Sequence, residues 1–513
     1  MNNIIPSGSL YQGAVLIQIP CRLKPLKLAG MGDTPSNSQI APEKGYNRPT
    51  YPIKVSAMAL SAALLEKYSK PGPRYTSYPT APYFNEAFGE KAWRDELEKT
   101  QASGRDLSLY VHIPFCDTLC YYCGCNMLAT KKYDKARDYL KFLFQEIDRV
   151  AALTAPGRTA RQIHWGGGTP TYLHPEDIRK LSQHLGTRFQ IGADAEIGCE
   201  VDPRELTREH IQALAESGFN RLSLGVQDLD DKVQQAVNRV QPESLVREVY
   251  GWMRAAGFQS INMDLMVGLP HQTVASFSTT LDKIIDMAPD RLAVFSYAHV
   301  PWMKKHQKLI QESDLPDLPT RIALQQLLLQ RLEAAGYAYI GMDHFAKPGD
   351  ELVKAQQHKT LYRNFQGYTT HKDCDIYAFG VSAISQTDEV YVQNAKNLSE
   401  YQQRIEHGGL ATERGLRISR DDRLRRDAIV RIMCDLELNK PAFSRQWQIE
   451  FDQYFAEARA ELAEMQQDGL VELNPESIRV TETGRMFLRN IAMCFDAYLK
   501  QPVEIKPRYS RTL

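Results

Sequence analysis

Four of the nine cysteines in this 513-residue chain lie in one short stretch, residues 112–126, which reads HIPFCDTLCYYCGCN. The first three follow the spacing Cys116-x3-Cys120-x2-Cys123, and Cys125 comes two residues after the third. Clustered thiols indicate metal binding or catalysis more than disulfides when the compartment is reducing. Structural zinc sites usually draw two ligand pairs from separate segments, and the sequence has no second pair with this spacing. Three thiolates in a short loop suit a cubane iron–sulfur cluster, which leaves a fourth iron open for a substrate or cofactor.

Cys125 leaves two interpretations open, because it could close the cluster as a fourth ligand or stay outside it. Its position two residues after Cys123 makes capture of the opposite corner awkward. We therefore predict three ligands, Cys116, Cys120 and Cys123, with Cys125 free or accessory. The other cysteines are isolated and fit no disulfide framework, so we expect small buried apolar residues at Cys21, Cys199, Cys374, Cys434 and Cys494.

The overall composition excludes several classes of partner. Lys and Arg number 62, and Asp and Glu also number 62, so no net field favours nucleic acid or an anionic membrane. No apolar run approaches the roughly 18 residues that a membrane helix needs, and the N-terminus lacks the pattern of a signal peptide. We therefore expect a cytoplasmic enzyme with no nucleic-acid partner and no membrane contact.

Short apolar strands alternate with amphipathic helical patterns between residues 106 and 345. Strands are expected at residues 107–113, 162–168, 195–202, 221–227, 261–269 and 291–300. Successive strand–helix units predict an α/β fold with a parallel sheet, helices outside and right-handed crossovers, in an open or closed barrel. In such folds the chemistry gathers where the strands end. The unusual residues at those ends are the four cysteines, the glycines at 166–168, Glu200, Gln227, Asp264 and His299.

The segments that flank the barrel differ from it in composition. Residues 1–57 are rich in Pro, Ser, Gly and Asn and are predicted to be a disordered extension, with an alternative start at Met58. Residues 58–105 include the aromatic stretch KPGPRYTSYPTAPYF, which we expect to pack on the barrel. Residues 346–420 are predicted to be a connecting segment near the active site, before a helical C-terminal domain at residues 421–513. That domain contains a hairpin with its turn at Asn474 and Pro475, and its mixed charges favour a substrate lid or structural cap over DNA binding.

Eight motifs occur in order along the chain: GPRYTSYPTA, YVHIPFC, CYYCGCN, HWGGGTPTYL, EVDPREL, GFNRLSLGVQD, GMDHFA and RNFQGYTT. Together they resemble the oxygen-independent coproporphyrinogen III oxidases of the radical S-adenosylmethionine (SAM) superfamily, from about residue 64 to the C-terminus. The resemblance implies a partial (β/α)6 TIM-like barrel with an N-terminal wrapping segment and a smaller winged-helix-like C-terminal domain. It also implies a 4Fe–4S cluster whose open iron binds SAM and reduces it to a 5′-deoxyadenosyl radical.

The resemblance implies a role for each residue that matches a family position. Cys116, Cys120 and Cys123 match the cluster ligands. Contacts to the cluster-bound SAM are implied for Tyr110, Gly167, Glu200 and Ile384. A second SAM is implied to contact Tyr122, Gly168, Thr169, Gln227, Arg239, Asp264 and Ala298. Tyr122 stands where the family often has Phe, so the aromatic face is kept.

Each of these residues also has an ordinary structural interpretation. The glycines at 166–168 could form a tight strand end, Glu200 and Asp202 could cap a helix, and Tyr110 could be a core residue. Gln227 and Asp264 could be satisfied polar groups at strand ends. His112 is either a hydrogen-bond donor near the cluster or a packed histidine, and His299 and His344 stay unassigned. The functional interpretation gains weight because the cysteine loop and several strand ends converge on one face.

The implied reaction is the oxidative decarboxylation of two propionate side chains of coproporphyrinogen III to vinyl groups, which gives protoporphyrinogen IX in haem biosynthesis. The implied partners are this substrate and an electron donor such as a flavodoxin or ferredoxin system, and we expect a monomer. Because the substrate carries several carboxylates, Arg74 is a candidate contact, with a surface arginine as the equal alternative.

Three rival functions stay open at this point: a haem-binding chaperone with the same barrel, a radical SAM enzyme that opens or methylates haem, and an iron–sulfur regulator with a winged helix. The motif GPRYTSYPTA and Cys125 favour the oxidase over the chaperone. The neutral charge and the six-unit barrel argue against the regulator.

Overall fold

The computed structural model describes residues 62–501 and 509–512, so the predicted extension at 1–57, Met58 and Cys21 lie outside the described residues. In the described parts the main sheet has the strand order β16-β15-β14-β13-β1-β4-β5-β6-β7-β8-β10-β9. None of the helices described there combines the length and the apolarity that crossing a bilayer requires.

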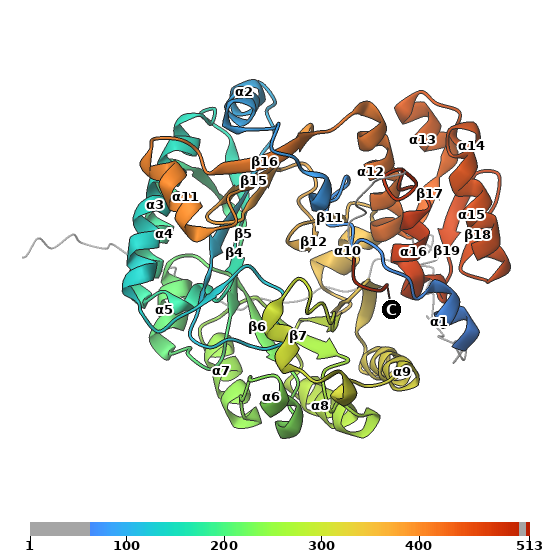
Figure 1. Cartoon of the computed structure of the whole chain (residues 1–513), viewed down its shortest axis with the longest axis horizontal. Helices are drawn as coiled ribbons and strands as arrows, with labels where there is room; N and C mark the ends of the chain where they lie inside the picture. Colours follow the sequence, from blue (N-terminus) through green and yellow to red (C-terminus); the bar gives the residue numbers. More distant parts are fainter. Residues whose placement is uncertain (1–61, 502–508, 513) are drawn as a thin grey trace, which may run out of the picture. The chain divides into compact units, whose positions relative to one another are not determined.

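The centre of this sheet confirms the predicted α/β barrel. Its parallel strands are β1 (Leu107–Ile113), β4 (Thr159–Gly167), β5 (Gln190–Val201), β6 (Arg221–Gln227), β7 (Ser260–Val267) and β8 (Arg291–Ser296). Helices cover the outside of the curved sheet in Figure 1. They are α3 (Asp134–Ala152), α4 (Pro175–Arg188), α5 (Arg208–Glu216), α6 (Asp231–Ala236), α7 (Glu243–Ala255), α8 (Val274–Met287) and α9 (Leu318–Ala334).

Alternation along the strands divides their side chains between an apolar core and a polar interior, because successive residues of a strand point to opposite faces. In β1 one set is buried in the core with the helices: Leu107, Leu109, Val111 and Ile113. The other set contains Ser108, which donates to Gln162, and Tyr110, which stacks on His164. Gln162 and His164 line a cavity of about 220 Å³ inside the barrel. The barrel interior is therefore polar and hollow.

Short strands extend the sheet at both edges. On one side β13 (Asp375–Phe379) pairs in parallel with β1, and the antiparallel strands β14 (Ile384–Gln386), β15 (Val390–Asn394) and β16 (Thr412–Arg417) follow. On the other side β10 (His344–Ala346) and β9 (Ala338–Gly341) continue antiparallel from β8. No strands were expected from the sequence within residues 346–420, since strands this short leave little periodicity to detect.

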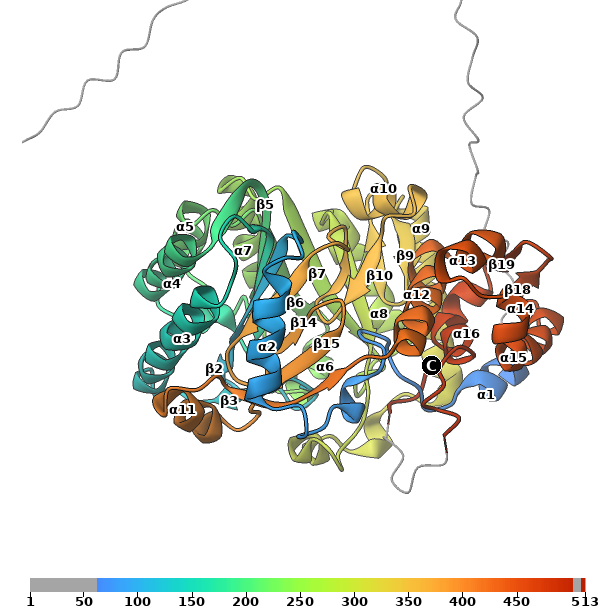
Figure 2. The ribbon, with the colours of Figure 1, turned by 90° about the horizontal axis from the view of Figure 1, so that it is seen from above.

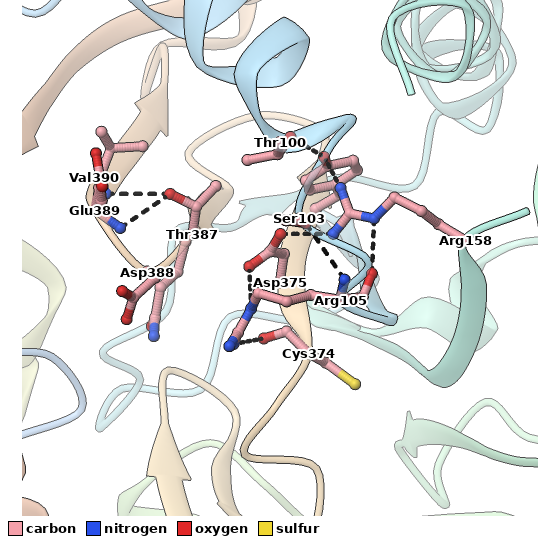
Figure 3. Close-up of polar contacts among 12 residues, drawn as sticks. Thr100, Ser103, Arg105, Arg158, Cys374, Asp375, Thr387, Asp388, Glu389 and Val390 are labelled. Carbon is pink, nitrogen blue, oxygen red and sulfur yellow. Dashed lines mark hydrogen bonds and ion pairs between the residues drawn. The ribbon is translucent and has the colours of Figure 1, made fainter. Parts of the chain in front are cut away.

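A buried ion-pair network fixes β13 beside β1 at the amino ends of the strands (Figure 3). Asp375 is 1% exposed and accepts from two arginines, Arg158 Nη2 at 2.5 Å and Arg105 Nε at 2.9 Å. Arg158 also donates to the Arg105 carbonyl at 2.7 Å and to the Tyr377 hydroxyl at 2.6 Å. Because Asp375 pairs with Leu107 in the sheet register, this network lies at the opposite end of β1 from the cysteine loop.

The C-terminal region contains α12 (Arg420–Asp435), α13 (Lys440–Trp447), α14 (Phe451–Tyr454), α15 (Ala456–Gln467) and α16 (Leu488–Met493), with a small sheet in the order β17-β19-β18. The predicted hairpin is formed by β18 (Val471–Leu473) and β19 (Ser477–Val480), and β17 (Glu437–Asn439) adds a third strand. The first described helix, α1 (Ala62–Tyr68), lies beside these helices in both ribbon views (Figures 1 and 2). Its Leu65 and Tyr68 belong to the C-terminal core, whereas α2 (Glu90–Thr100) contributes Trp93 and Leu97 to the barrel core.

Candidate active site at the carboxyl ends of the barrel strands

The cysteine loop begins where β1 ends and is fastened to the neighbouring strand by its backbone. Gly168 N donates to the Ile113 carbonyl and Thr169 N to the Phe115 carbonyl, both at 2.8 Å. A Cβ atom at Gly168 would lie 2.7 Å from the Phe115 carbonyl oxygen, so only glycine allows this approach. Gly167 has a φ of +115° and is equally restricted. The glycine run therefore positions the loop, and the sequence prediction placed it at the correct strand end.

The thiols of the loop are surrounded by hydrogen-bond donors. Cys120 is buried, and its Sγ accepts from Arg204 Nη2 at 3.4 Å and Arg239 Nη1 at 3.5 Å. Both guanidinium groups are held by Asp202, at 2.7 and 2.9 Å. Cations and N–H donors stabilise a thiolate, the form that binds iron. The chemistry of this donor set fits an iron–sulfur cluster.

The remaining two predicted ligands are half-buried. Cys116 Sγ lies 3.3 Å from Thr169 Oγ1, and Cys123 Sγ accepts from the backbone N–H of Cys125 at 3.4 Å. Among the residues that the structure describes, no three Cys, His, Asp or Glu side chains are grouped so as to hold a single metal ion. A cubane cluster does not require such grouping, because each thiolate binds a different iron. Cys125 itself is exposed.

A segment after β8 supports the back of the cysteine loop. Gln307 Nε2 donates to the Tyr122 carbonyl at 2.9 Å, and Lys304 Nζ donates to the Cys125 carbonyl at 2.8 Å. His306 Nε2 lies 2.7 Å from the Cys123 carbonyl oxygen. The sequence alone did not indicate a role for four residues near the loop: Lys304, His306, Gln307 and Arg204. The one available signal was that these residues follow β5 and β8, whose ends meet at the same edge as the loop.

Two carboxylates inside the barrel have different electrostatic environments. Glu200 accepts from the backbone N–H of Gly167 at 3.2 Å and lies 3.5 Å from His164 Nε2. Although burial opposes it, the hydrogen bond and charge of His164 and the Gly167 N–H hold the pKa of Glu200 below its usual value. Burial and the nearby Glu200 raise the pKa of Asp264 to about 6, against hydrogen bonds from Ser223 and Asn262. Glu200 therefore stays ionised at neutral pH and can accept from hydroxyl or ammonium groups.

The other predicted site residues lie around this centre. Gln227, at the end of β6, adopts a φ of +69°, a conformation that residues other than glycine rarely adopt and that often marks a functional site. Arg239 is buried and donates to the Gly225 carbonyl at 2.6 Å in addition to its ion pair with Asp202. Ala298 lines a cavity of about 680 Å³ beyond the end of β8. Ile384 starts β14, which β13 separates from β1, so it is farther from the loop in the sheet order.

The structure shows the surroundings of His112, His299 and the isolated cysteines in the described residues, to which the sequence assigned no role in the site. His112 is buried between the Tyr110 hydroxyl at 3.1 Å and the Asn126 carbonyl at 2.9 Å, so it is a packed residue that joins β1 to the end of the loop. Burial lowers its pKa. His299 bonds to the Tyr297 hydroxyl at 2.8 Å. The isolated cysteines agree with the prediction at Cys199, Cys434 and Cys494, which are buried, whereas Cys374 is half-buried.

Comparison with known proteins gives consistent matches over most of the chain. Residues 110–284 match the Radical SAM superfamily, and residues 418–487 match the HemN C-terminal domain. The oxygen-independent coproporphyrinogen III oxidase of Escherichia coli (strain K12) is 47% identical over 461 residues, which are 90% of this chain and 100% of that protein. A protein of the same name from Pseudomonas aeruginosa is 44% identical over 454 residues, 88% of this chain and 98% of that protein.

A solved structure agrees with these matches. The coproporphyrinogen III oxidase HemN from Escherichia coli, described as a radical SAM enzyme, superimposes with a TM-score of 0.81 at 47% identity, covering 83% of this chain and 97% of that chain. Membership in the radical SAM superfamily implies a 4Fe–4S cluster and SAM as cofactors. The chain therefore belongs to the oxygen-independent coproporphyrinogen III oxidases of the radical SAM superfamily.

Proposed function

We propose that this protein decarboxylates two propionate side chains of coproporphyrinogen III to vinyl groups without oxygen, forming protoporphyrinogen IX in haem biosynthesis. The observation that carries the proposal is the position of the cysteine loop. It lies at the carboxyl ends of a hollow polar barrel, next to a cavity of about 680 Å³ that Ala298 lines. A cavity of this size suits a large organic substrate. The names of the relatives at 44–47% identity support the same activity.

In this proposal Cys116, Cys120 and Cys123 hold the cluster, and Cys125 is not a ligand. The cluster and SAM, when bound, supply the radical that removes a hydrogen from the β-carbon of a propionate. The chain itself binds and orients. The contacts to the cluster-bound SAM come from Tyr110, Gly167, Glu200 and Ile384.

A second SAM is part of the proposal. Its contacts come from Tyr122, Gly168, Thr169, Gln227, Arg239, Asp264 and Ala298. The raised pKa of Asp264 supports this role, because a cationic ammonium group would stabilise the carboxylate that burial disfavours. Arg239, which bonds to both Asp202 and Cys120, would maintain positive charge between the cluster and the second SAM.

The proposed electron donor is a small protein such as a flavodoxin or ferredoxin, and the proposed state is a monomer. The first part is supported by the chemistry of the cofactors, because a 4Fe–4S cluster that reduces SAM must itself receive an electron.

An anaerobic assay with coproporphyrinogen III, SAM and a chemical reductant tests the activity. We expect CO2 and 5′-deoxyadenosine to form together with protoporphyrinogen IX. Tight haem binding without either product would instead support a haem chaperone. Equilibrium dialysis with labelled SAM tests the stoichiometry, with two molecules expected per chain and one for Asp264→Asn.

The ligand assignment has a matched pair of variants. Cys120→Ser should lose iron and turnover, because an alcohol does not replace a buried thiolate ligand. Cys374→Ser changes a half-buried thiol at the opposite end of the barrel and should keep both. Iron content and absorbance of the purified protein give the result, and a Cys120→Ser variant with an intact cluster would refute the assignment.

A further inference from the structure

Several arginines gather between the end of β8 and the C-terminal region. Arg74, from the segment after α1, and Arg321, on α9, line both the 680 Å³ cavity and a neighbouring one of about 80 Å³. Arg489, on α16, lines the smaller cavity. Among the described residues that line the two cavities, Asp343 is the single carboxylate, and it bonds to Arg74 at 2.7 Å. In a chain whose charges balance overall, this site carries a local positive excess.

Arg489 is a buried cation that has no acidic partner among the described residues. Its side chain donates to the backbone carbonyls of Gly72 and of Pro73, the latter at 3.1 Å, and of Arg511 at 2.9 Å. It forms no ion pair with any carboxylate in residues 62–501 or 509–512. Burial and the neighbouring charge of Arg74 lower the pKa of its guanidinium, so the charged form is disfavoured here.

Arg363, on β11 (Tyr362–Asn364), is a second buried cation of this kind. It is 5% exposed, and its Nη1 atom is buried with no hydrogen-bond partner in the described part of the chain. Its Nε donates to the Arg74 carbonyl at 3.4 Å, and its guanidinium lies 4.9 Å from the centroid of the Tyr368 ring. Arg363 and Arg489 therefore both contact the backbone at or next to Arg74.

The cavity that Arg74 and Arg321 line reaches the proposed active centre. The Arg74 guanidinium lies 3.5 Å from the carbonyl of Ser296, the last residue of β8, and 5.9 Å from the centroid of the Phe295 ring. Two residues further along, Ala298 lines the larger cavity, as Arg74 and Arg321 do. An anion bound at Arg74 and Arg321 would therefore lie in the same cavity as the end of β8, where the proposed second SAM binds.

We propose that the arginine cluster binds the propionate carboxylates of the tetrapyrrole that the reaction leaves in place. The cluster consists of Arg74, Arg321 and Arg489, which line the cavities, and of Arg363, which packs behind Arg74 and adds its charge. This inference rests on the proposed function, whose substrate carries more carboxylates than the reaction removes. Guanidinium groups bind carboxylates through paired N–H donors, and the buried Arg489, which donates to backbone carbonyls, favours a further anion beside it. Holding these carboxylates orients the ring and determines which propionates face the SAM side.

A binding experiment on the enzyme loaded with its iron–sulfur cluster distinguishes the contribution of charge to ligand affinity from that of cavity shape. The probes are coproporphyrin III, which keeps the same carboxylates on a stable oxidised ring, and its tetramethyl ester, which has none ionised. Arg321→Gln should weaken binding of the free acid by about ten- to a hundredfold and leave the ester unchanged. Arg445→Gln, an exposed arginine on α13, should change neither.

Arg74 needs a paired variant, because its removal alone leaves Asp343 without its cation. Arg74→Gln/Asp343→Asn removes both charges, so a purely structural ion pair predicts normal binding of the free acid. The inference predicts the same selective loss as in Arg321→Gln, with KM rising more than kcat in turnover. If Arg321→Gln fails to fold, Arg321→Lys keeps the charge and should retain part of the preference for the free acid.

The results also separate this inference from the proposed function. Equal losses for acid and ester, or no loss in either set of variants, would overturn the carboxylate site while wild-type turnover stands. A wild-type enzyme that neither converts coproporphyrinogen III nor binds coproporphyrin III would overturn both.

Discussion

Two groups of arginines occupy opposite ends of the barrel, and they differ in how their charge is balanced. At the amino ends of the strands, Asp375 uses one carboxylate oxygen for Arg158 and the other for Arg105 (Figure 3). Beyond the carboxyl end of β8, Asp343 is the single carboxylate among the described residues that line the two cavities, and it pairs with Arg74. Arginines that are paired with a carboxylate stabilise the fold, whereas buried arginines that outnumber the nearby carboxylates are stabilised only when an anionic ligand binds. The comparison assigns the first group to structure and the second to binding.

The largest effect is expected from Asp375→Ala, which leaves Arg158 buried without its carboxylate. We expect a loss of about 3–5 kcal/mol in the free energy of unfolding. Urea unfolding of the purified protein measures it. The matched control is Asp194→Ala, which removes a carboxylate that is 81% exposed and lies 3.1 Å from Arg161. This surface pair should contribute at most about 1 kcal/mol. If both variants lose the same small amount of free energy of unfolding, the Asp375 network does not have the structural role assigned to it.

The sequence predicted the barrel strands because apolar residues that face the helices recur along each of them, as Leu107, Leu109, Val111 and Ile113 do in β1. It also predicted the cysteine loop, whose spacing is local, and the resemblance supplied the residues that are proposed to contact SAM. Apart from Arg74, neither source of information reaches the two arginine groups. Arg158 and Asp375 are 217 residues apart, and the contact of Arg489 with Gly72 spans 417 residues. No periodicity encodes such pairs.

Arg74 illustrates the same limit. The motif around it made it a candidate, but its sequence neighbours did not distinguish a binding residue from a surface arginine. The structure shows a half-buried side chain paired with Asp343, with the buried Arg363 and Arg489 packed against its backbone. Charge balance in a folded protein depends on residues brought together from distant segments, and a linear sequence does not display it.

A smaller effect on stability is expected from Glu146, whose buried carboxylate extends the comparison from buried arginines to a buried acid. Its carboxylate on α3 accepts from the Gly380 N–H, the Asn394 amide and the Tyr401 hydroxyl, at 2.7, 2.6 and 2.7 Å. Burial raises its pKa to about 7 despite these donors. The folded state therefore binds the proton more tightly than the unfolded state. Stability is greatest below the unfolded pKa and falls as pH rises towards about 7, by at most about 3 kcal/mol.

Urea unfolding at about pH 5 and about pH 8 measures this slope. Glu146→Gln cannot ionise, so the difference between the two pH values should shrink even if hydrogen bonds are lost. Glu98→Gln, at an exposed position on α2, provides the control and should keep the wild-type slope. A Glu146→Gln variant with an unchanged slope would show that Glu146 does not titrate in this range.

The smallest effect is expected from Arg363→Met, and its sign decides the comparison. The substitution removes a buried charge with an unpaired Nη1 atom, and methionine fills part of the space against Tyr368. The hydrogen bond that it loses, to the Arg74 carbonyl at 3.4 Å, is long and therefore weak. We expect the free energy of unfolding to rise by about 1 kcal/mol, while binding of coproporphyrin III weakens.

The same substitution in the other group should have the opposite sign. Arg158→Met leaves Asp375 buried beside Arg105 alone and removes the hydrogen bond to Tyr377, so the protein should lose stability. Urea unfolding and coproporphyrin III titration of the two variants, side by side, give the result. If Arg363→Met raises the free energy of unfolding and Arg158→Met lowers it, Arg363 serves anion binding although its buried charge reduces stability. A different result would contradict this: both variants lose stability and both keep their affinity for coproporphyrin III. The two groups would then have the same structural role, because removing an arginine that binds the ligand must weaken the binding of that ligand.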